Sequence, residues 1–338
     1  MNKTYTIAAL RGDGIGPEVT EATIKVLTAI QQKSSFQLNI LYGEAGYHCI
    51  KDYGTNLPKE TIDLLKETEA CLKGPMTTPE ETGAPVSVAV TLRRMFNLYA
   101  NVRPCRTFPS VESLKPDIDL VVVRENTEGM YSGMESLLSP GVGVALRVIT
   151  RDASLKVAHF AFKLAQQRRK HLTYIHKGNI LRLTDGIFKE AVKEAQRDYP
   201  DVEVDDLHID AATMQLIKKP GAYDVMVTTN LFGDIISDEA AQVTGSLGLA
   251  AGANIGENYG MFEPVHGSAP KYTGKNYVNP IATILAGSMM MDYLGEKQAA
   301  LTIENAVVTV LEEGKIRTAD LGGKATTSEM ADAIAKKI

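Results

Sequence analysis

The amino-acid sequence predicts an α/β protein in which helices cover the faces of a largely parallel sheet. Strand-like runs alternate with helix-length runs along the whole chain of 338 residues. A chain of this length exceeds the size at which a single core stops growing, so we expect two lobes. No Pro-, Gly- or Ser-rich linker separates two halves, which indicates lobes joined by strands that cross between them.

The strand predictions come from short apolar runs that are rich in β-branched residues and bounded by turn residues. They cover residues 4–10, 36–45, 70–76, 117–126, 171–178 and 223–231. Helix-length stretches between them include residues 16–32 and 154–170. Neither an internal repeat nor a low-complexity segment interrupts this alternation.

Composition and charge exclude several classes of protein. The net charge is −5 with interspersed signs, and no basic block suits a nucleic-acid backbone. The sequence contains no run of 18 apolar residues, so we expect no membrane-spanning helix. Three cysteines, an odd number without C-x-x-C spacing, favour a reducing compartment. With no visible signal peptide, we expect a cytoplasmic protein with no membrane partner.

A glycine run, "GDGIGPEV", follows the first expected strand and precedes the first expected helix. A dinucleotide fingerprint would require glycine at positions 12, 14 and 17, but Pro17 occupies the third position. Proline is instead well suited to the first turn of a helix. The run therefore predicts a tight turn into a helix and argues against a Rossmann fold.

Arg93, Arg103 and Arg124 stand in or beside apolar segments. Guanidinium groups bind carboxylates in a bidentate manner, so three converging arginines would suit a di- or tricarboxylate. Arg124 follows the strand-like "DLVVV", and ligands bind at the carboxyl ends of strands in α/β proteins. The alternative for each arginine alone is a solvated surface charge.

Tyr131 and Lys177 are candidate proton carriers. Tyr131 follows Arg124 across a "TEG" turn, and Lys177 stands at the end of the expected strand 171–178. A lysine whose pKa is lowered by burial can accept a proton. Taken alone, a tyrosine in this position is more often a packing residue.

Asp210, Asp234 and Asp238 form an oxygen-only set that suits Mg²⁺ or Mn²⁺. Asp234 and Asp238 are four residues apart, so on a helix they share one face. The competing interpretation is a pair of helix-start carboxylates stabilised by the macrodipole.

Farther along, the segment "FEPVHGSAPKYTGKNYVNPIATI" contains a loop of small residues whose N–H groups suit phosphates.

Together these segments resemble the β-decarboxylating dehydrogenases, the family of isocitrate, homoisocitrate and 3-isopropylmalate dehydrogenases. The motifs "GDGIGPEV", "KGPMTTP", "LRRMFNLYANVRP", "VRENTEGMYSG", "HKGNIL", "NLFGDIISDEAAQ" and "FEPVHGSAP" occur in order along nearly the whole chain. The resemblance implies a two-lobed, non-Rossmann fold with a mixed sheet and helices on both faces. It implies a discontinuous cofactor-side lobe at 1–98 plus 246–338, and a lobe at 99–245 with the metal site and dimer interface.

The resemblance also implies roles for individual residues. Tyr131 and Lys177 match the catalytic acid–base pair, and Asp210, Asp234 and Asp238 match ligands of Mg²⁺ or Mn²⁺. In the homodimer that it implies, Lys177 and Asp210 reach across from the neighbouring subunit. The substrate-binding set is Ser87, Arg93, Arg103, Arg124 and Asp210. The cofactor-binding set is Thr77, Thr78, Asn179, Glu263, His266, Gly267, Ser268, Ala269, Lys271, Tyr272, Val278 and Asn279.

The residues before Arg93 bear on the substrate. Isopropylmalate enzymes place Glu and paired Leu where this chain has Val86, Ala89 and Val90. Ser87 matches the isocitrate enzymes, although Ala89 replaces their Asn. We expect isocitrate as the substrate, with homoisocitrate as the alternative, and then 3-isopropylmalate or a tartrate- or malate-type acid.

Two further questions concern the cofactor and catalytic competence. Lys271 and Tyr272 suit a 2′-phosphate and favour NADP over NAD, although Ala319 and Gly323 stand where NADP-using relatives place Tyr and Arg.

The alternative to an enzyme is a non-catalytic regulatory subunit. The retention of Tyr131 and all three aspartates favours an enzyme.

Overall fold

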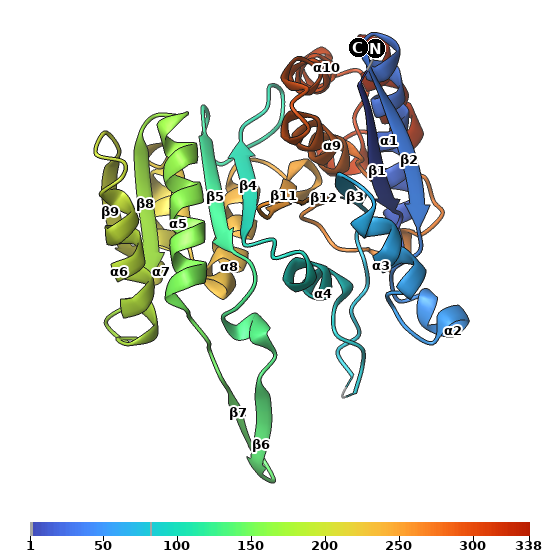
Figure 1. The fold of residues 1–338 in the computed structure, drawn as a ribbon. Coiled ribbons are helices and arrows are strands. Elements are labelled where there is room, and N and C mark those ends of the chain that lie inside the picture. Colours follow the sequence, from blue (N-terminus) through green and yellow to red (C-terminus); the bar gives the residue numbers. More distant parts are fainter. Residues whose placement is uncertain (1–2, 82) are drawn as a thin grey trace.

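The computed structural model describes residues 3–81 and 83–338. One ten-stranded sheet crosses the molecule in the order β2-β1-β3-β12-β11-β4-β5-β10-β8-β9 (Figure 1). The strands are β1 (Lys3–Leu10), β2 (Phe36–Gly43), β3 (Ala70–Lys73), β4 (Ala100–Arg106), β5 (Asp119–Glu125), β8 (His171–His176), β9 (Glu203–His208), β10 (Val225–Thr228), β11 (Ala251–Ile255) and β12 (Gly260–Pro264). Pairing is parallel toward both ends and antiparallel in the middle, where β4 pairs with β5 and β11, and β11 with β12. The expected mixed α/β sheet is confirmed.

Each of the six expected strands overlaps an observed one, but four strands of the sheet were not predicted. Strands β11 and β12, "AGANI" and "GMFEP", contain few β-branched residues, and β9, "EVDDLH", is polar. Burial on both faces of the central sheet, rather than intrinsic propensity, determines the conformation of β11 and β12. Polar β9 instead pairs along one side only, at the edge of the sheet.

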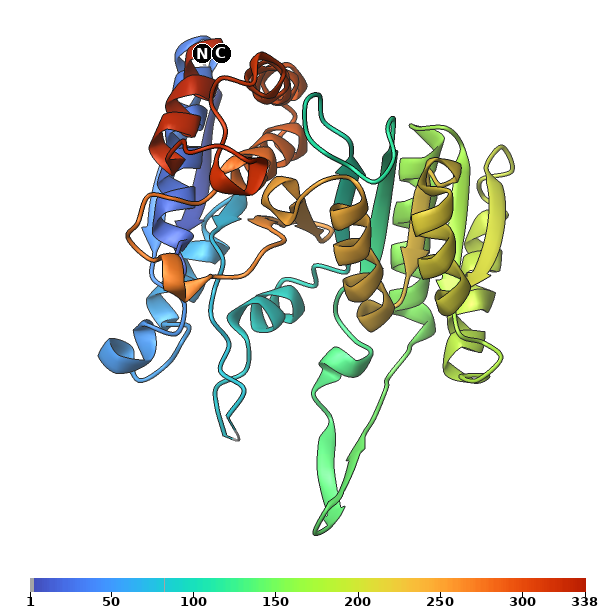
Figure 2. The ribbon, with the colours of Figure 1, turned by 180° about the vertical axis from the view of Figure 1, so that it is seen from behind.

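Helices cover both faces of the sheet, as expected (Figure 2). On one face the main core contains apolar residues of α1 (Gly16–Gln32), α5 (Arg151–Gln166), α6 (Thr184–Gln196), α9 (Ile281–Tyr293), α10 (Lys297–Glu313) and α11 (Thr327–Lys337). On the other face α7 (Ile209–Lys218) and α8 (Asn230–Val243) pack on β5 and β10, while α3 (Lys59–Lys66) and α4 (Val88–Met95) pack on β1 and β3. Within the described residues, no helix is both long and apolar enough to cross a membrane.

The two halves of the molecule meet where β4 and β11 run side by side (Figure 1). Their register joins Ala100–Val102 to Ala253–Ile255, because Ala253 pairs with Val102 and Ile255 with Ala100. We propose that the lobes divide near this ladder, into 1–98 plus 246–338 and 99–245. This division would place the predicted arginines on both sides of the junction.

The glycine run forms a tight turn between β1 and α1. Gly12 and Gly14 have φ of 73° and 60°, in the left-handed region that favours glycine. A Cβ on Gly12 would lie 2.2 Å from the Pro75 carbonyl oxygen, and one on Gly14 would lie 2.0 Å from that of Ser268. The glycines therefore allow three chain segments to approach closely.

A two-stranded arm projects away from both lobes (Figure 1). It consists of β6 (Glu135–Ser139) and β7 (Val142–Ala145), which pair with each other and with no strand of the large sheet. Leu137 and Leu138 on this arm are 76% and 70% exposed. Apolar side chains this exposed indicate a surface that contacts another molecule.

Candidate functional site

The three predicted arginines converge on the α4 and α8 side of the sheet. Buried asparagines connect Arg93 to Arg103, and Asp234 connects Arg103 to Arg124. Arg93, from α4, donates from Nε to Asn254 Oδ1 at 3.0 Å, and Asn101 Nδ2 donates to the same oxygen at 2.9 Å. Arg103, from β4, donates to Asn101 Oδ1 at 2.7 Å. Arg124, at the end of β5, is 1% exposed. Buried guanidinium groups with these fixed partners are not solvated surface charges, so the alternative interpretation is wrong.

Asp234 and Asp238 lie on one face of α8 and share a guanidinium group. Arg103 contacts Asp238 Oδ1 at 2.9 Å and Asp234 Oδ1 at 3.2 Å, and Arg124 also pairs with Asp234. Burial opposes ionisation of Asp234, but Arg124 and Arg103 outweigh it and lower its pKa below the ordinary value. Burial raises the pKa of Asp238. Thus the two carboxylates jointly hold a positive charge.

Tyr131 lies beside this pair of carboxylates, in the short 3-10 helix η1 (Met130–Ser132). Its hydroxyl donates to Asp234 Oδ2, and the Arg124 guanidinium lies 4.8 Å from the centre of its ring. Burial and the Asp234 carboxylate raise the pKa of Tyr131, although Arg124 acts against this. The phenol therefore stays protonated at neutral pH and is able to donate a proton.

Lys177 and Asp210 form a second, separate pair. The Lys177 Nζ lies 2.6 Å from Asp210 Oδ1, and the Lys177 backbone N–H donates to the buried Asp185 at 2.5 Å. Among the residues that the structure describes, no hydrogen bond or ion pair joins this pair to Asp234 or Tyr131. A single chain thus brings together only part of the expected catalytic set.

Glu263, expected near the cofactor, holds Arg93 in place from β12. This carboxylate is 8% exposed and contacts Lys73 Nζ at 2.6 Å and the Arg93 guanidinium at 3.0 Å. Burial disfavours its charge, but Lys73 and Arg93 hold its pKa well below the usual range. Sequence reasoning assigned no role to Lys73 or Asn254. The signal that could have identified Lys73 is its position at the end of "ACLK", a strand that is buried along its whole length.

Thr77 and Ser268, expected near the nicotinamide and in the phosphate loop, contact each other at 2.7 Å through their hydroxyl oxygens. The Thr77 N–H also donates to Asp13 at 2.8 Å, which ties both loops to the glycine turn. In the same loop the buried His266 Nε2 has no hydrogen-bond partner among the described residues, while Gly267 is exposed. An unpaired buried nitrogen beside an exposed glycine fits a polar ligand.

The residues after this loop form an exposed group of lysines and tyrosines. Lys271 Nζ lies 4.8 Å from the centre of the Tyr272 ring, which stacks on Tyr277 at 5.3 Å. Asn279 donates to Asp320 at 3.0 Å, near the start of α9. The remaining cofactor candidates are Thr78 and Asn179, which are exposed, and Ala269 and Val278, which are partly buried.

Ser87 is the N-cap residue of α4, the helix that carries Arg93. Its side chain makes no capping hydrogen bond within the part of the chain that the structure describes, so the hydroxyl is available to a ligand. The N–H groups of the first helical turn also lack intrahelical partners. This helix start is suited to a negatively charged group.

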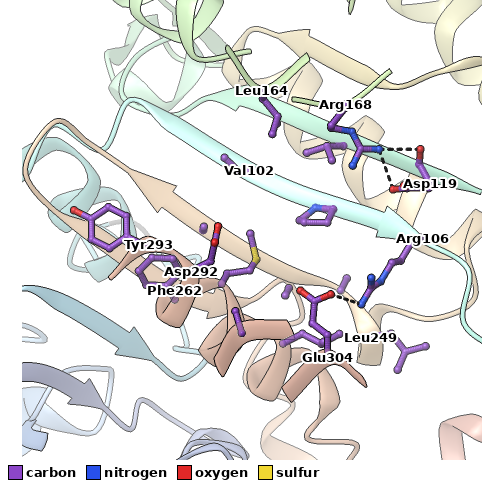
Figure 3. A pocket seen from close by; sticks show the side chains of 18 of the residues that line it. Val102, Arg106, Asp119, Leu164, Arg168, Leu249, Phe262, Asp292, Tyr293 and Glu304 are labelled. Atoms are coloured by element: carbon purple, nitrogen blue, oxygen red, sulfur yellow. Dashed lines mark hydrogen bonds and ion pairs between the residues drawn. The ribbon is translucent and has the colours of Figure 1, made fainter. Parts of the chain in front are cut away.

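A cavity of about 770 Å³ lies on the opposite face of the sheet from the arginines (Figure 3). Val102, Pro104 and Arg106 of β4 line it, whereas Arg103 points to the other face because side chains alternate along a strand. The Arg106–Glu304 ion pair, at 2.9 Å, spans one side of the cavity. This cavity is therefore separate from the candidate site.

Comparison with known proteins identifies the family. A family model described as "Isocitrate/isopropylmalate dehydrogenase" matches residues 6–334. The chain belongs to this family. Its members are oxidoreductases, the β-decarboxylating dehydrogenases, and they generally use NAD(P) and a divalent metal.

Individual members of the isocitrate/isopropylmalate dehydrogenase family are similar over the whole chain. The 3-isopropylmalate/3-methylmalate dehydrogenase of Methanocaldococcus jannaschii is 46% identical, covering 99% of both chains. The isocitrate/homoisocitrate dehydrogenase of Thermus thermophilus is 45% identical, covering 99% of this chain and 98% of that one. The isocitrate dehydrogenase structure from Methylococcus capsulatus has a TM-score of 0.94 at 44% identity, covering 98% and 99%. Overall identity thus does not discriminate between substrates.

Glu128 is a buried acid near the candidate site, and it should make the free energy of unfolding of this protein depend on pH. It accepts hydrogen bonds from the Thr150 N–H at 2.8 Å and hydroxyl at 2.9 Å, but burial raises its pKa from 4.5 to about 7. The raised pKa means that the folded state binds more protons between these values. We expect this group to lower the free energy of unfolding as pH rises from about 4.5 to about 7.

Glu128→Gln should remove this dependence, which amounts to up to about 3 kcal/mol. Urea unfolding near pH 5 and near pH 8 measures it in both proteins. The exposed Glu312→Gln is the matched control. Parallel pH profiles for Glu128→Gln and the parent protein would contradict the assignment.

Proposed function

We propose that the protein catalyses the metal-dependent oxidative decarboxylation of isocitrate to 2-oxoglutarate, with NAD(P)⁺ as hydride acceptor. The observation that carries the choice of substrate is the free Ser87 hydroxyl at the start of α4. Isocitrate has a third carboxylate, which would be stabilised by this hydroxyl and the helix N-terminus. An isopropyl group would gain nothing from these donors.

Homoisocitrate is the second candidate substrate. Its side chain is one methylene longer than that of isocitrate and ends in the same carboxylate. Ala89, in the first turn of α4, is small and carries no donor, which favours accommodation of the extra methylene. The same helix start would then receive the distal carboxylate.

The residues of this chain suggest how the reaction proceeds. Arg93, Arg103 and Arg124 would bind and orient the substrate carboxylates, since all three are buried and held by fixed partners. Lys177 would accept the proton of the 2-hydroxyl as hydride leaves C2. After CO₂ is lost, Tyr131 would protonate the enol, consistent with its raised pKa.

Asp234 and Asp238, with Asp210 from a partner subunit, would hold the divalent metal. The fit rests on the two α8 carboxylates, which already share one cationic group. When bound, Mg²⁺ or Mn²⁺ would supply Lewis-acid stabilisation of negative charge, and NAD(P)⁺ would supply the hydride acceptor. In this proposal the cavity on the opposite face of the sheet takes no part in metal binding or hydride transfer.

Steady-state kinetics with isocitrate, homoisocitrate and 3-isopropylmalate test the proposed substrate. We expect the highest kcat/KM with isocitrate. Ser87→Ala should lower kcat/KM for isocitrate about tenfold, because a hydrogen bond to a charged group is lost, and leave that for 3-isopropylmalate nearly unchanged. Thr91→Ala, one turn farther along α4, is the matched control, since the Thr91 hydroxyl donates to the Ser87 carbonyl and to no other described residue. Equal losses with both acids would contradict the role of Ser87.

For the cofactor we propose NADP, supported by the exposed Lys271 beside Tyr272. Lys271→Asp combined with Tyr272→Ile should shift the NADP/NAD ratio of kcat/KM toward NAD at least about tenfold, because donors to the 2′-phosphate disappear. Lys275→Asp alone tests whether any nearby lysine has the same effect. An unchanged ratio in the double variant would exclude these two residues from cofactor choice.

We further propose a homodimer that shares its active sites. The Lys177–Asp210 pair is separate from the Asp234 cluster within one chain. Exposed apolar residues on α7, on α8 and in the turn before α6 favour an interface there; they are Ile180, Leu183, Met214, Ile217, Leu231 and Ile235. Pairing of two such faces would bring Lys177 and Asp210 of one protomer to the cluster of the other.

A further inference from the structure

A second group of metal-ligating side chains lies where β2 leads into the short helix α2 (Cys49–Tyr53; Figure 1). Glu44, His48 and Cys49 each offer one ligand atom, and these atoms lie within 4.8 Å of one another. The His48 Nε2 is 3.1 Å from Glu44 Oε2 and 3.3 Å from Cys49 Sγ. Three different ligand types therefore lie close enough together to share one cation.

The separations match the edges of a small coordination polyhedron. Nitrogen, oxygen and sulfur ligands at ordinary zinc distances in a tetrahedron lie about 3.3–3.7 Å apart. Small side-chain shifts would bring the observed separations into this range. Glu44 and His48 are about half exposed, whereas Cys49 is fully buried. A cation would enter from the exposed side and keep one position for water.

Asp13 orients the imidazole of His48 from behind. Its Oδ1 lies 2.8 Å from His48 Nδ1, and its carboxylate is itself fixed by the N–H groups of Tyr47, His48 and Thr77. Burial opposes its charge, but these hydrogen bonds lower the pKa of Asp13. The ionised Asp13 carboxylate holds a proton on Nδ1. A bound cation would replace the proton on Nε2, which faces Glu44 Oε2 at 3.1 Å. Metal-binding histidines are commonly oriented in this way.

We propose that Glu44, His48 and Cys49 bind a borderline-soft divalent cation of the zinc class, at a site independent of the carboxylate site on α8. Imidazole and thiolate ligands select such an ion over Mg²⁺, which prefers oxygen ligands. Binding exchanges the Cys49 thiol proton for the cation and requires no change of oxidation state. Burial and the carboxylates of Glu44, Asp13 and Asp52 raise the pKa of Cys49 to about 11, so the thiol keeps its proton until the cation binds.

The site is connected to the cofactor side of the molecule through Asp13. The same carboxylate that orients His48 also receives the Thr77 N–H, and Thr77 contacts Ser268. A cation on His48 would hold this carboxylate, and hence the glycine turn, more firmly. Occupancy is therefore expected to raise the thermal stability of the chain.

Cobalt(II) binding by the full chain tests the proposal, with excess Mg²⁺ present to occupy the carboxylate site. Tetrahedral cobalt with a thiolate ligand gives intense visible bands and a sulfur-to-metal charge-transfer band. We expect one equivalent with this spectrum, displaced by Zn²⁺, and at least about tenfold weaker binding in His48→Gln and Glu44→Gln. Cys49→Ser should lose the charge-transfer band, whereas Cys105→Ser, at another buried free cysteine, should retain it.

Asp238→Asn distinguishes the two sites, because it should leave the thiolate–cobalt spectrum unchanged. If Cys49→Ser does not fold, the exposed Glu44→Gln and His48→Gln variants still decide the question. Cobalt bound without a charge-transfer band, or with the same band and affinity in all variants, would overturn the proposal. Failure of the proposed isocitrate activity would not affect this result, since binding is measured without substrate.

Discussion

Asp234→Asn is expected to lower metal-dependent turnover about 100-fold or more. The substitution removes a negatively charged ligand, so the metal that would stabilise the developing negative charge binds less well. Asp234 also organises the site: Arg103 and Arg124 both pair with it, and Tyr131 donates to it. A neutral amide would weaken all three contacts. The loss should therefore appear in kcat as well as in the Mn²⁺ concentration needed for half-maximal rate.

The measurement is the initial rate as a function of Mn²⁺ concentration, with Glu239→Gln as the control. Glu239 is on the same helix, and no ion pair involves it among the described residues. Its substitution removes the same charge from α8 without touching the arginines. Unimpaired turnover of Asp234→Asn at limiting Mn²⁺ would exclude Asp234 as a ligand.

Hybrid dimers should restore activity to two inactive variants. Lys177→Ala and Asp234→Asn are each expected to abolish turnover. If Lys177 serves the Asp234 cluster of the partner, a hybrid of the two variants contains one site with both defects and one intact site. Random mixing at equal amounts should recover about a quarter of the wild-type sites.

The control is a mixture of Asp234→Asn with Asp238→Asn. Both substitutions lie in the same cluster on α8, so every hybrid site carries one defect and no recovery is expected. The readout is specific activity after unfolding and refolding the proteins together. Recovery in neither mixture would place Lys177 and Asp234 in the same chain's site, or outside the active site altogether.

Much of the fold was predictable because the outer strands and the first helix have a clear local pattern. The helix predicted at 16–32 agrees with α1, whose start is set by Pro17 in the first turn. By contrast, α5 starts at Arg151, earlier than predicted, because Thr150 caps it by accepting from the Ala153 N–H at 3.2 Å. The middle of the sheet was missed because β11 is formed by small residues between neighbouring strands.

The candidate site was predictable where chemistry and spacing coincide, as in Asp234 and Asp238 on α8. The asparagines that link the arginines were not predictable from the residues alone. Asn101 and Asn254 are separated by 153 positions, and each is an ordinary polar residue until the β4–β11 ladder pairs them. Glu263 was assigned to the cofactor, since nothing in its local sequence indicates the buried lysine opposite it.

In the proposed homodimer, the order of the arm formed by β6 and β7 would depend on the protein concentration. An isolated two-stranded hairpin is at best marginally stable in water, and this one has no buried strand residues of its own. Its leucines, Leu137 and Leu138, would be removed from water only by packing against the surface of another molecule. Under mass action, dilution would then loosen the arm first and leave the large sheet intact.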